Sequence, residues 1–259
     1  GVVGEDFPDD GIELLQTSGV DIRGLERAPG KTFRWSGRYH ADLNRRDTLL
    51  TELNCFEHFQ PKLPADYREA KYLFLGNIHP SLQLSVLDQA TGAKFVGMDT
   101  MNFWISGAYD ALRAVMARVD AITINDEEAR ELTGQTNIVR AARAIQEMGP
   151  KLVVIKRGEY GALIVRGDQY FFTPAFPLED VVDPTGAGDS FAGGFMGYIA
   201  RHDSTSWPAL CQAVIAGSTL ASFSVEAFSV DALRGLTHDR VIERAMAFRR
   251  LTDFPSIVL

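Results

Sequence analysis

The sequence has little of the residues that mark several common classes of protein. Only two of its 259 residues are cysteines, so no disulfide framework is expected, and free thiols fit a protein of the reducing cytoplasm. Its five histidines show no metal-ligand spacing. No apolar run approaches the roughly 18 residues that a membrane span requires, so no membrane-spanning helix is expected.

Basic residues are also in the minority. The 26 lysines and arginines are outnumbered by 34 aspartates and glutamates, which gives a formal net charge of −8. A protein whose main partner is nucleic acid or an anionic membrane needs a basic face, so neither partner is expected. What is present, 46% hydrophobic and 23% charged residues, is typical of a globular chain with a large core.

Short apolar runs alternate with helical patterns through the middle of the chain. The runs predicted to be strands are Tyr72–Leu75, Lys94–Met98, Ala121–Ile124, Leu152–Ile155, Ala162–Val165 and Tyr170–Thr173. The helices predicted between the earlier strands are Pro80–Ala90, Gly107–Ala117, Asp126–Leu132 and Ile138–Met148. This alternation predicts an α/β fold with a parallel sheet and helices on both faces. Glycines leave no room for helices between residues 152 and 173, which predicts consecutive hairpins there.

The last third of the chain, residues 186–250, is predicted to be mostly helical. Apolar residues near its start recur with helical spacing and form one stripe for a core. Glycines in that stretch lower the helix propensity, so they are expected where the backbone of a neighbouring element comes close: Gly193, Gly194 and Gly197.

The domain organisation is predicted from two further segments. Residues 31–55 resemble a hairpin insertion that is too short for a core of its own, and we interpret them as a lid or edge subdomain. The apolar opening at Gly1–Gly4 is typical of a strand already under way. We therefore expect residues 1–259 to form a single domain that lacks its natural N-terminal segment.

The segment with the clearest chemistry is Val181–Ser190, where a strand end meets a glycine-rich turn that opens a helix. Unsatisfied N–H groups at a helix start form an anion site, and Gly186 and Gly188 let the backbone approach the anion. Asp189 places a carboxylate at the same spot, which suits a base that deprotonates a hydroxyl attacking a phosphoryl group. One alternative is that Asp189 only caps the helix. A dinucleotide-binding turn is a second alternative, although its third glycine would fall at Phe191.

Three motifs resemble those of one known family. Asp183–Gly194 closely resembles the C-terminal signature of the ribokinase-like (PfkB) carbohydrate kinases, D-T-x-G-A-G-D, with Pro184 in place of the usual threonine. Asn125–Glu128 is similar to the N-x-x-E element, and Lys156–Gly158 to the strand end that approaches nucleotide phosphates. The resemblance covers essentially the whole chain. It implies a ribokinase-like fold, with a central mostly parallel sheet, flanking helices and a small β lid.

The resemblance also assigns catalytic roles. Asp189 would be the catalytic base, and the backbone N–H groups of Gly186, Ala187 and Gly188 would form the anion hole. In-line attack by the deprotonated hydroxyl on the γ-phosphoryl group of ATP would give a phosphate ester and ADP. The implied activity is an ATP-dependent kinase acting on a hydroxyl of a sugar or a nucleoside.

Further residues are assigned to the nucleotide and its ions. The resemblance implies that Asn125 and Glu128 organise the nucleotide phosphates and, through water, Mg²⁺, which suits an ion that keeps several waters. A helix cap followed by a first-turn acid is the alternative for this pair. Lys156, Gly158 and Thr185 would bind the nucleotide, with Lys156 countering phosphate charge. A monovalent cation beside the anion hole is a further expectation, which would begin at Thr185 and the preceding Asp183.

The acceptor is expected at the lid and at the strand ends. Arg38 in the lid, together with Trp35, Tyr39, Asp42 and Asn44, would face the acceptor, or would instead cover the sheet or a homodimer partner. Asn77 and Asn102 follow strand ends, where α/β proteins bind ligands, and their amides suit hydroxyl groups. Ordinary turn chemistry explains both asparagines equally well.

Two other functions remain open at this stage. The chain could be a non-catalytic protein that binds a nucleotide or sugar on a kinase scaffold. It could also phosphorylate a vitamin-like heterocyclic alcohol, although the expected β lid favours the sugar or nucleoside branch.

Overall fold

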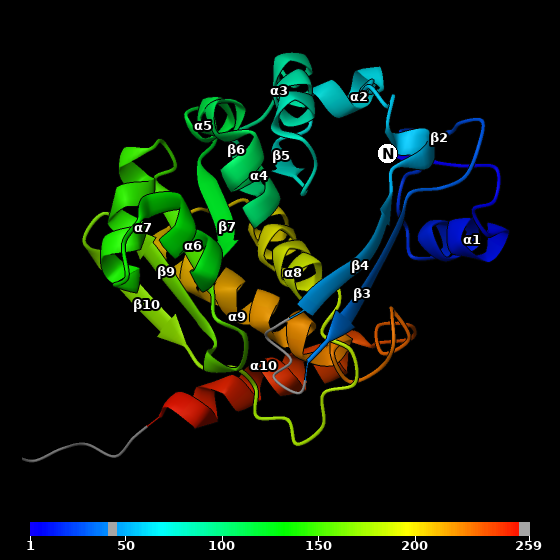
Figure 1. Ribbon diagram of the computed structural model, residues 1–259. Helices are drawn as coiled ribbons and strands as arrows, with labels where there is room; N and C mark the ends of the chain where they lie inside the picture. Colours follow the sequence, from blue (N-terminus) through cyan, green and yellow to red (C-terminus); the bar gives the residue numbers. More distant parts are fainter. Residues whose placement is uncertain (41–45, 254–259) are drawn as a thin grey trace, which may run out of the picture. The chain divides into compact units, whose positions relative to one another are not determined.

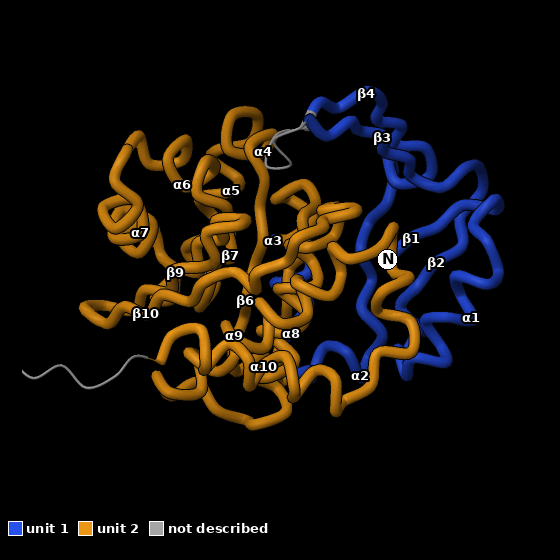
Figure 2. Tube along the Cα trace, turned by 90° about the horizontal axis from the view of Figure 1, so that it is seen from below, with its two compact units in different colours: residues 1–70, 84–92 blue, residues 71–83, 93–259 orange. Residues whose placement is uncertain are grey.

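The computed structural model describes residues 1–40 and 46–253 (Figure 1). The chain divides into two compact units, which are coloured separately in Figure 2. Unit 1 comprises residues 1–70 and 84–92, and unit 2 comprises residues 71–83 and 93–259. Within the described residues, no helix is both long enough and apolar enough to cross a bilayer.

Unit 2 is built on a six-stranded sheet with the order β10-β9-β8-β7-β6-β5. Its strands are β5 (Tyr72–Leu75), β6 (Phe95–Asp99), β7 (Ala121–Asn125), β8 (Leu152–Lys156), β9 (Ala162–Arg166) and β10 (Gln169–Thr173). Strands β5 to β8 are parallel, whereas β9 and β10 are added by antiparallel hairpins. Each predicted strand is confirmed to within a residue at either end, and so are the consecutive hairpins.

The helices of unit 2 also follow the sequence pattern, with one exception. They are α4 (Asn102–Gly107), α5 (Tyr109–Met116), α6 (Asp126–Thr133), α7 (Ile138–Glu147), α8 (Ala187–His202), α9 (Trp207–Ser224) and α10 (His238–Thr252). Helix α3 (Pro80–Gln89) begins in unit 2 and ends in unit 1. The single helix predicted over Gly107–Ala117 is wrong at its start. The backbone at Ala108 leaves the helical region (φ −143°) and separates α4 from α5.

The sheet carries helices on both faces. Strands β5 to β8 stand in chain order, and right-handed crossovers then place the connecting helices α4 to α7 on one face. Helices α8 and α9 pack on the other face (Figure 1), where apolar side chains such as Val154, Ile164 and Phe195 form a buried core. The start of α8 is therefore supported from beneath by the sheet.

Helices α8 and α9 approach each other closely at two glycines. A Cβ added to Gly194 would lie 2.8 Å from the carbonyl oxygen of Ala216, and one added to Gly217 would lie 2.7 Å from that of Phe191. Gly193 and Gly197 have open space instead. The expected close approach is thus confirmed at Gly194 and wrong at the other two positions.

Unit 1 contains short elements around a hairpin. They are β1 (Val2–Val3), α1 (Asp9–Thr17), β2 (Glu26–Arg27), β3 (Arg34–Tyr39), β4 (Arg46–Glu52), a 3₁₀ turn (Asn54–Phe56) and α2 (Ala65–Arg68). Strands β3 and β4 pair antiparallel, which confirms the hairpin predicted within residues 31–55. Its action as a lid stays a prediction, as does the single-domain organisation. Asp42 and Asn44 lie outside the described residues.

Candidate active site

Three neighbouring strands end in polar residues at the same edge of the sheet. Asp99 ends β6, Asn125 ends β7 and Lys156 ends β8, with Asn125 paired opposite Lys156. Because side chains alternate along a strand, each of these residues points to the same face as the core residues Phe95, Ala121 and Val154. That face is the one covered by α8. The predicted site residues Asn125 and Lys156 are therefore brought to one face, together with Asp99.

Lys156 and Asp99 form a largely buried ion pair. The Lys156 Nζ lies 3.1 Å from the Asp99 Oδ2, and the two side chains are 18% and 9% exposed. The other oxygen of Asp99 accepts a hydrogen bond of 2.9 Å from the backbone N–H of Thr100. A Cβ added to Gly188 would lie 3.2 Å from the Lys156 Nζ. The ammonium group thus lies directly against the glycine turn at the start of α8.

The turn itself depends on glycine. Gly186 is the N-cap residue of α8 and adopts a φ of +80°, which other residues rarely adopt. Its carbonyl oxygen accepts the first helical hydrogen bond, from the N–H of Ser190 at 2.8 Å. The N–H of Ala187 donates to Pro184 over 3.2 Å, a turn bond for which an incoming anion would compete. The other N–H groups of a first helical turn lack intrahelical acceptors, so they suit phosphoryl oxygens.

Asp189 lies in the first turn of α8 with an exposed side chain. Gly186 occupies the N-cap position, so the alternative that Asp189 is the capping residue does not hold. A negative charge in the first helical turn is stabilised by the helix dipole. The carboxylate is therefore held beside the anion site while it remains accessible to an acceptor.

Asp183 anchors the loop that precedes the turn. Its two carboxylate oxygens accept hydrogen bonds from the backbone N–H groups of Thr185 (2.9 Å) and Ser229 (3.4 Å). Burial alone would raise the pKa of Asp183, but these hydrogen bonds outweigh burial and lower it below its ordinary value. The N–H of Val182 also donates to Val225 at 2.8 Å, which ties the loop to the end of α9.

Asn125 and Glu128 form a reciprocal capping box at the start of α6. The Asn125 Oδ1 accepts from the Glu128 N–H at 2.8 Å, and the Glu128 Oε2 accepts from the Asn125 N–H at 3.0 Å. The helix-capping alternative is thus realised in the structure. Among the described residues no group of three or more His, Cys, Asp or Glu could hold a metal ion. With these oxygens engaged by the backbone, the pair fits a magnesium ion contacted through water better than one coordinated directly.

The loop after Lys156 is closed by its own glycines. Gly158 has a φ of +52° and opens a 3₁₀ turn (Gly158–Tyr160). The N–H of Arg157 donates to the carbonyl oxygen of Gly161 at 2.8 Å. Gly161 packs against the backbone of Thr173 with no space for a Cβ. The loop therefore leaves the strand in a fixed direction, which positions Lys156 at its base.

The residues predicted to bind the acceptor are divided between the two units, unlike the predicted nucleotide-binding residues. The Asn77 Oδ1 accepts from the indole Nε1 of Trp104 at 2.8 Å, and the Asn102 Oδ1 accepts from the N–H of Phe103 at 3.0 Å. Asn102 is thus engaged in local turn chemistry at the start of α4. Arg38 is exposed on β3 and belongs to unit 1, as do Trp35 and Tyr39 on the same strand, whereas the remaining predicted site residues that the structure describes belong to unit 2.

Sequence reasoning missed Asp99 and an aromatic group around Trp104. The Trp104 ring lies edge-on to His79 (5.0 Å between centroids) and to Phe103 (4.8 Å). Phe103 is 60% exposed. This aromatic group (His79, Phe103 and Trp104) follows the ends of β5 and β6, the edge at which α/β proteins bind ligands. The tryptophan two residues after Asn102 was the available signal.

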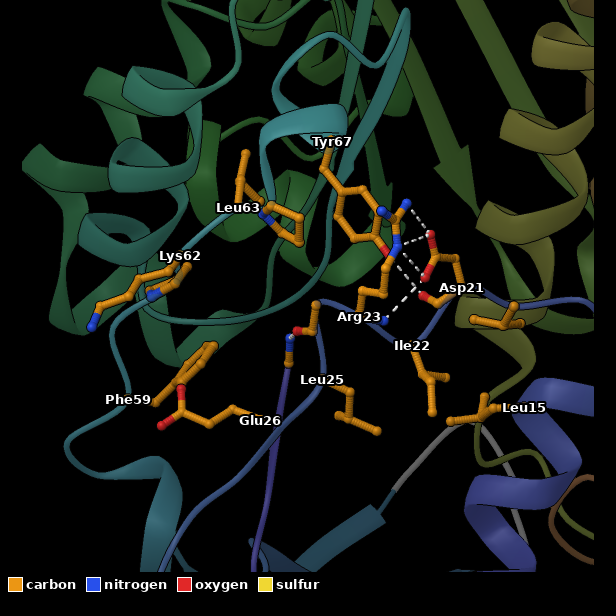
Figure 3. A pocket seen from close by; sticks show the side chains of 15 residues that line it. Leu15, Asp21, Ile22, Arg23, Leu25, Glu26, Phe59, Lys62, Leu63 and Tyr67 are labelled. Carbon is orange, nitrogen blue, oxygen red and sulfur yellow. Dashed lines mark hydrogen bonds and ion pairs between the residues drawn. The ribbon is translucent and has the colours of Figure 1, made fainter.

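Unit 1 contains separate hollows that include none of the predicted site residues. One, with a volume of about 410 Å³, is shown in Figure 3. Asp21 and Arg23 in its lining are paired with each other: the Arg23 Nη2 lies 2.6 Å from the Asp21 Oδ2, and the Tyr67 hydroxyl donates to the Asp21 carbonyl oxygen at 2.8 Å. The Arg23 guanidinium also lies over the Tyr67 ring. This network is explained by the packing of unit 1.

Solved structures show the same fold. The chain is similar to the nucleoside kinase of Methanocaldococcus jannaschii, with a TM-score of 0.75 and 22% identity over 95% of this chain and 79% of the other. It is also similar to the ribokinase of Thermotoga maritima, with a TM-score of 0.72 and 22% identity over 96% and 80%. The expected ribokinase-like fold is therefore confirmed.

Sequence comparisons then give the family. Residues 1–233 match the pfkB family carbohydrate kinases, and the chain belongs to this family. The cytidine kinase of Thermococcus kodakarensis is 37% identical over 205 residues, which are 77% of this chain and 72% of that protein. The aminoimidazole riboside kinase of Salmonella typhimurium is 29% identical over 125 residues, 47% of this chain and 39% of that protein.

Family membership fixes the class of reaction. The chain is a transferase of the kinase class, with ATP as the phosphoryl donor and an alcohol group of a sugar or nucleoside as the acceptor. The predictions of family, fold and enzyme class are confirmed at this level.

Proposed function

We propose that the protein phosphorylates a hydroxyl group of a nucleoside with ATP, and that cytidine is the first acceptor to test. The support is the 37% identity to a cytidine kinase over most of both chains. The aromatic group at the ends of β5 and β6 adds to it, because aromatic faces suit the flat face of a nucleobase.

One juxtaposition carries the proposed chemistry. Asp189 is an exposed acid in the first turn of α8, and the glycine turn of that helix lies against the buried ammonium of Lys156. Asp189 accepts the proton of the acceptor hydroxyl, whose oxygen attacks the γ-phosphorus as the bond to the ADP oxygen breaks. The N–H groups of residues 186–188 and Lys156 stabilise the negative charge on the transferred phosphoryl oxygens.

The expected ions have candidate positions. Asn125 and Glu128 would hold Mg²⁺ through water, and Gly158 and Thr185 would border the nucleotide. When bound, Mg²⁺ neutralises phosphate charge and orients the phosphate chain. A monovalent cation would lie near Asp183 and Thr185, where the carboxylate of Asp183 already organises the loop.

A coupled assay of ADP release tests the function across cytidine, other nucleosides, ribose and fructose. Turnover of cytidine or another nucleoside in preference to free sugars is expected. Preference for a free sugar would overturn the nucleoside assignment. ATP binding without turnover of any acceptor would favour the non-catalytic alternative.

Asp189→Asn tests the base directly. The variant is expected to lose about 10²–10⁴-fold in kcat, because the acceptor hydroxyl loses its proton acceptor, while ATP affinity measured by calorimetry changes little. The matched control is Asp110→Asn, since Asp110 is also an exposed acid in the first turn of a helix, α5. Equal turnover by Asp189→Asn and the parent would show that the base is assigned wrongly.

A further inference from the structure

The pair formed by Asp99 and Lys156 calls for an explanation beyond stability. Both side chains are mostly buried, and a buried ion pair loses hydration that its mutual attraction only partly returns. An apolar pair of similar volume would often be at least as stable. The pair also lies against the turn at Gly188, so a functional role is the better explanation.

We propose that Asp99 is a positioning residue, which holds the ammonium group of Lys156 over the glycine turn so that it faces the phosphoryl oxygens bound at the start of α8. This inference rests on the proposed function. It adds a residue that does not itself contact the substrate and acts through Lys156.

The carboxylate of Asp99 is a fixed support. One of its oxygens accepts the N–H of Thr100 at 2.9 Å. Its backbone carbonyl oxygen accepts from the Nε2 of Gln83 at 3.1 Å, and the same Nε2 donates to Gly76 at 2.9 Å. Gln83 is only 1% exposed. The ends of β5 and β6 are thereby joined, and Asp99 has little freedom to move.

Lys156 needs such a support. Its side chain is a flexible four-carbon stem, and its ammonium group has three hydrogen-bond donors. One donor is directed to the Asp99 Oδ2, which leaves others for phosphoryl oxygens on the side of Gly188. Without the Asp99 carboxylate, the ammonium group of Lys156 could still contact the phosphates, but it would adopt several orientations. Removing the carboxylate would therefore weaken stabilisation of the transition state more than it weakens nucleotide binding.

Asp99→Asn and Lys156→Met separate these effects. We expect Asp99→Asn to lower kcat about 10–100-fold while the dissociation constant of ATP stays the same or falls, because a competing negative charge has been removed. Lys156→Met is expected to weaken ATP binding and lower kcat together. The control Asp168→Asn alters a surface ion pair, with Arg143, and is expected to retain the parent kcat and ATP affinity.

The double variant distinguishes positioning from a structural role. If Asp99 acts through Lys156, then Asp99→Asn in the Lys156→Met background leaves kcat unchanged within about threefold. A further tenfold loss in that background would overturn the inference, as would parental kcat in Asp99→Asn. The double variant removes both charges of the pair. It is compared with Lys156→Met, so this comparison can be made even if Asp99→Asn alone fails to fold.

Binding of ATP without magnesium and without an acceptor, measured by calorimetry, gives a readout that does not need turnover. Weaker binding to Lys156→Met, but not to Asp99→Asn, supports the inference even if no acceptor is phosphorylated and the proposed function fails. Equal loss of ATP affinity in both variants would overturn it.

Discussion

Asp183 shows how a single carboxylate links stability to pH. Hydrogen bonds to Thr185 and Ser229 lower the pKa of Asp183 below its ordinary value of 3.8 despite partial burial. A group whose pKa is lowered by folding stabilises the folded state above its unfolded pKa. That contribution is lost as the pH falls through the folded pKa.

We expect Asp183→Asn to flatten the acid limb of the stability profile. As the pH falls below about 4, the urea midpoint of the parent should fall more steeply than that of the variant. Asp168→Asn serves as the control, since that side chain is 99% exposed. Parallel acid limbs for the parent and Asp183→Asn would contradict the anchoring role.

At the residue scale, the sequence indicates candidate site residues where a motif is continuous and misses them where the interacting residues are distant in sequence. The turn at residues 183–189 is predictable because its glycines and acidic residues are adjacent in the sequence. Asp99 is a single acidic residue at a strand end, and its proposed role depends on its ion pair with Lys156, which lies 57 positions later in the sequence. The sequence predicts that Asn77 binds a hydroxyl group of the acceptor. In the folded chain its side chain instead accepts a hydrogen bond from Trp104, which the sequence does not indicate.

Among the elements, the crossing of α8 and α9 makes a sharp stability prediction. Gly194→Ala is expected to destabilise the fold by about 1–3 kcal/mol, because the new methyl group would meet the backbone of Ala216. Gly197→Ala is the control: its position is open, and alanine should stabilise α8 by up to about 1 kcal/mol. Urea unfolding checks both, and shifts of the same sign would contradict the packing described.

The elements were predictable because their apolar periods are strong. Buried parallel strands read as short apolar runs, and helices between them show a 3.6-residue period. The break at Ala108 was not visible, because alanine favours helix and only the tertiary structure turns α4 away from α5. The sequence does not distinguish Gly193, Gly194, Gly197 and Gly217, and only packing separates Gly194 and Gly217 from the open pair.

For the molecule as a whole, self-association through the hairpin is the prediction left to test. Leu49 and Leu50 on β4 are 56% and 42% exposed, and such residues on an edge hairpin suit pairing with a second copy. Sedimentation velocity is expected to show a dimer that Leu49→Arg/Leu50→Arg converts to monomer. Phe228→Ser, which removes a 72% exposed ring elsewhere, should leave it intact. A monomeric parent would rule out this contact.

The order of the strands limits how the proposed site could be transferred between genes. Asp99, Asn125, Lys156 and the turn before α8 come from separate stretches, and they meet only because β6, β7 and β8 lie side by side in chain order. A short excised fragment therefore would not bring the proposed site residues together. Recombination that moves the proposed site into another gene would have to carry the chain from β6 to α8, including the intervening β9 and β10, as one block.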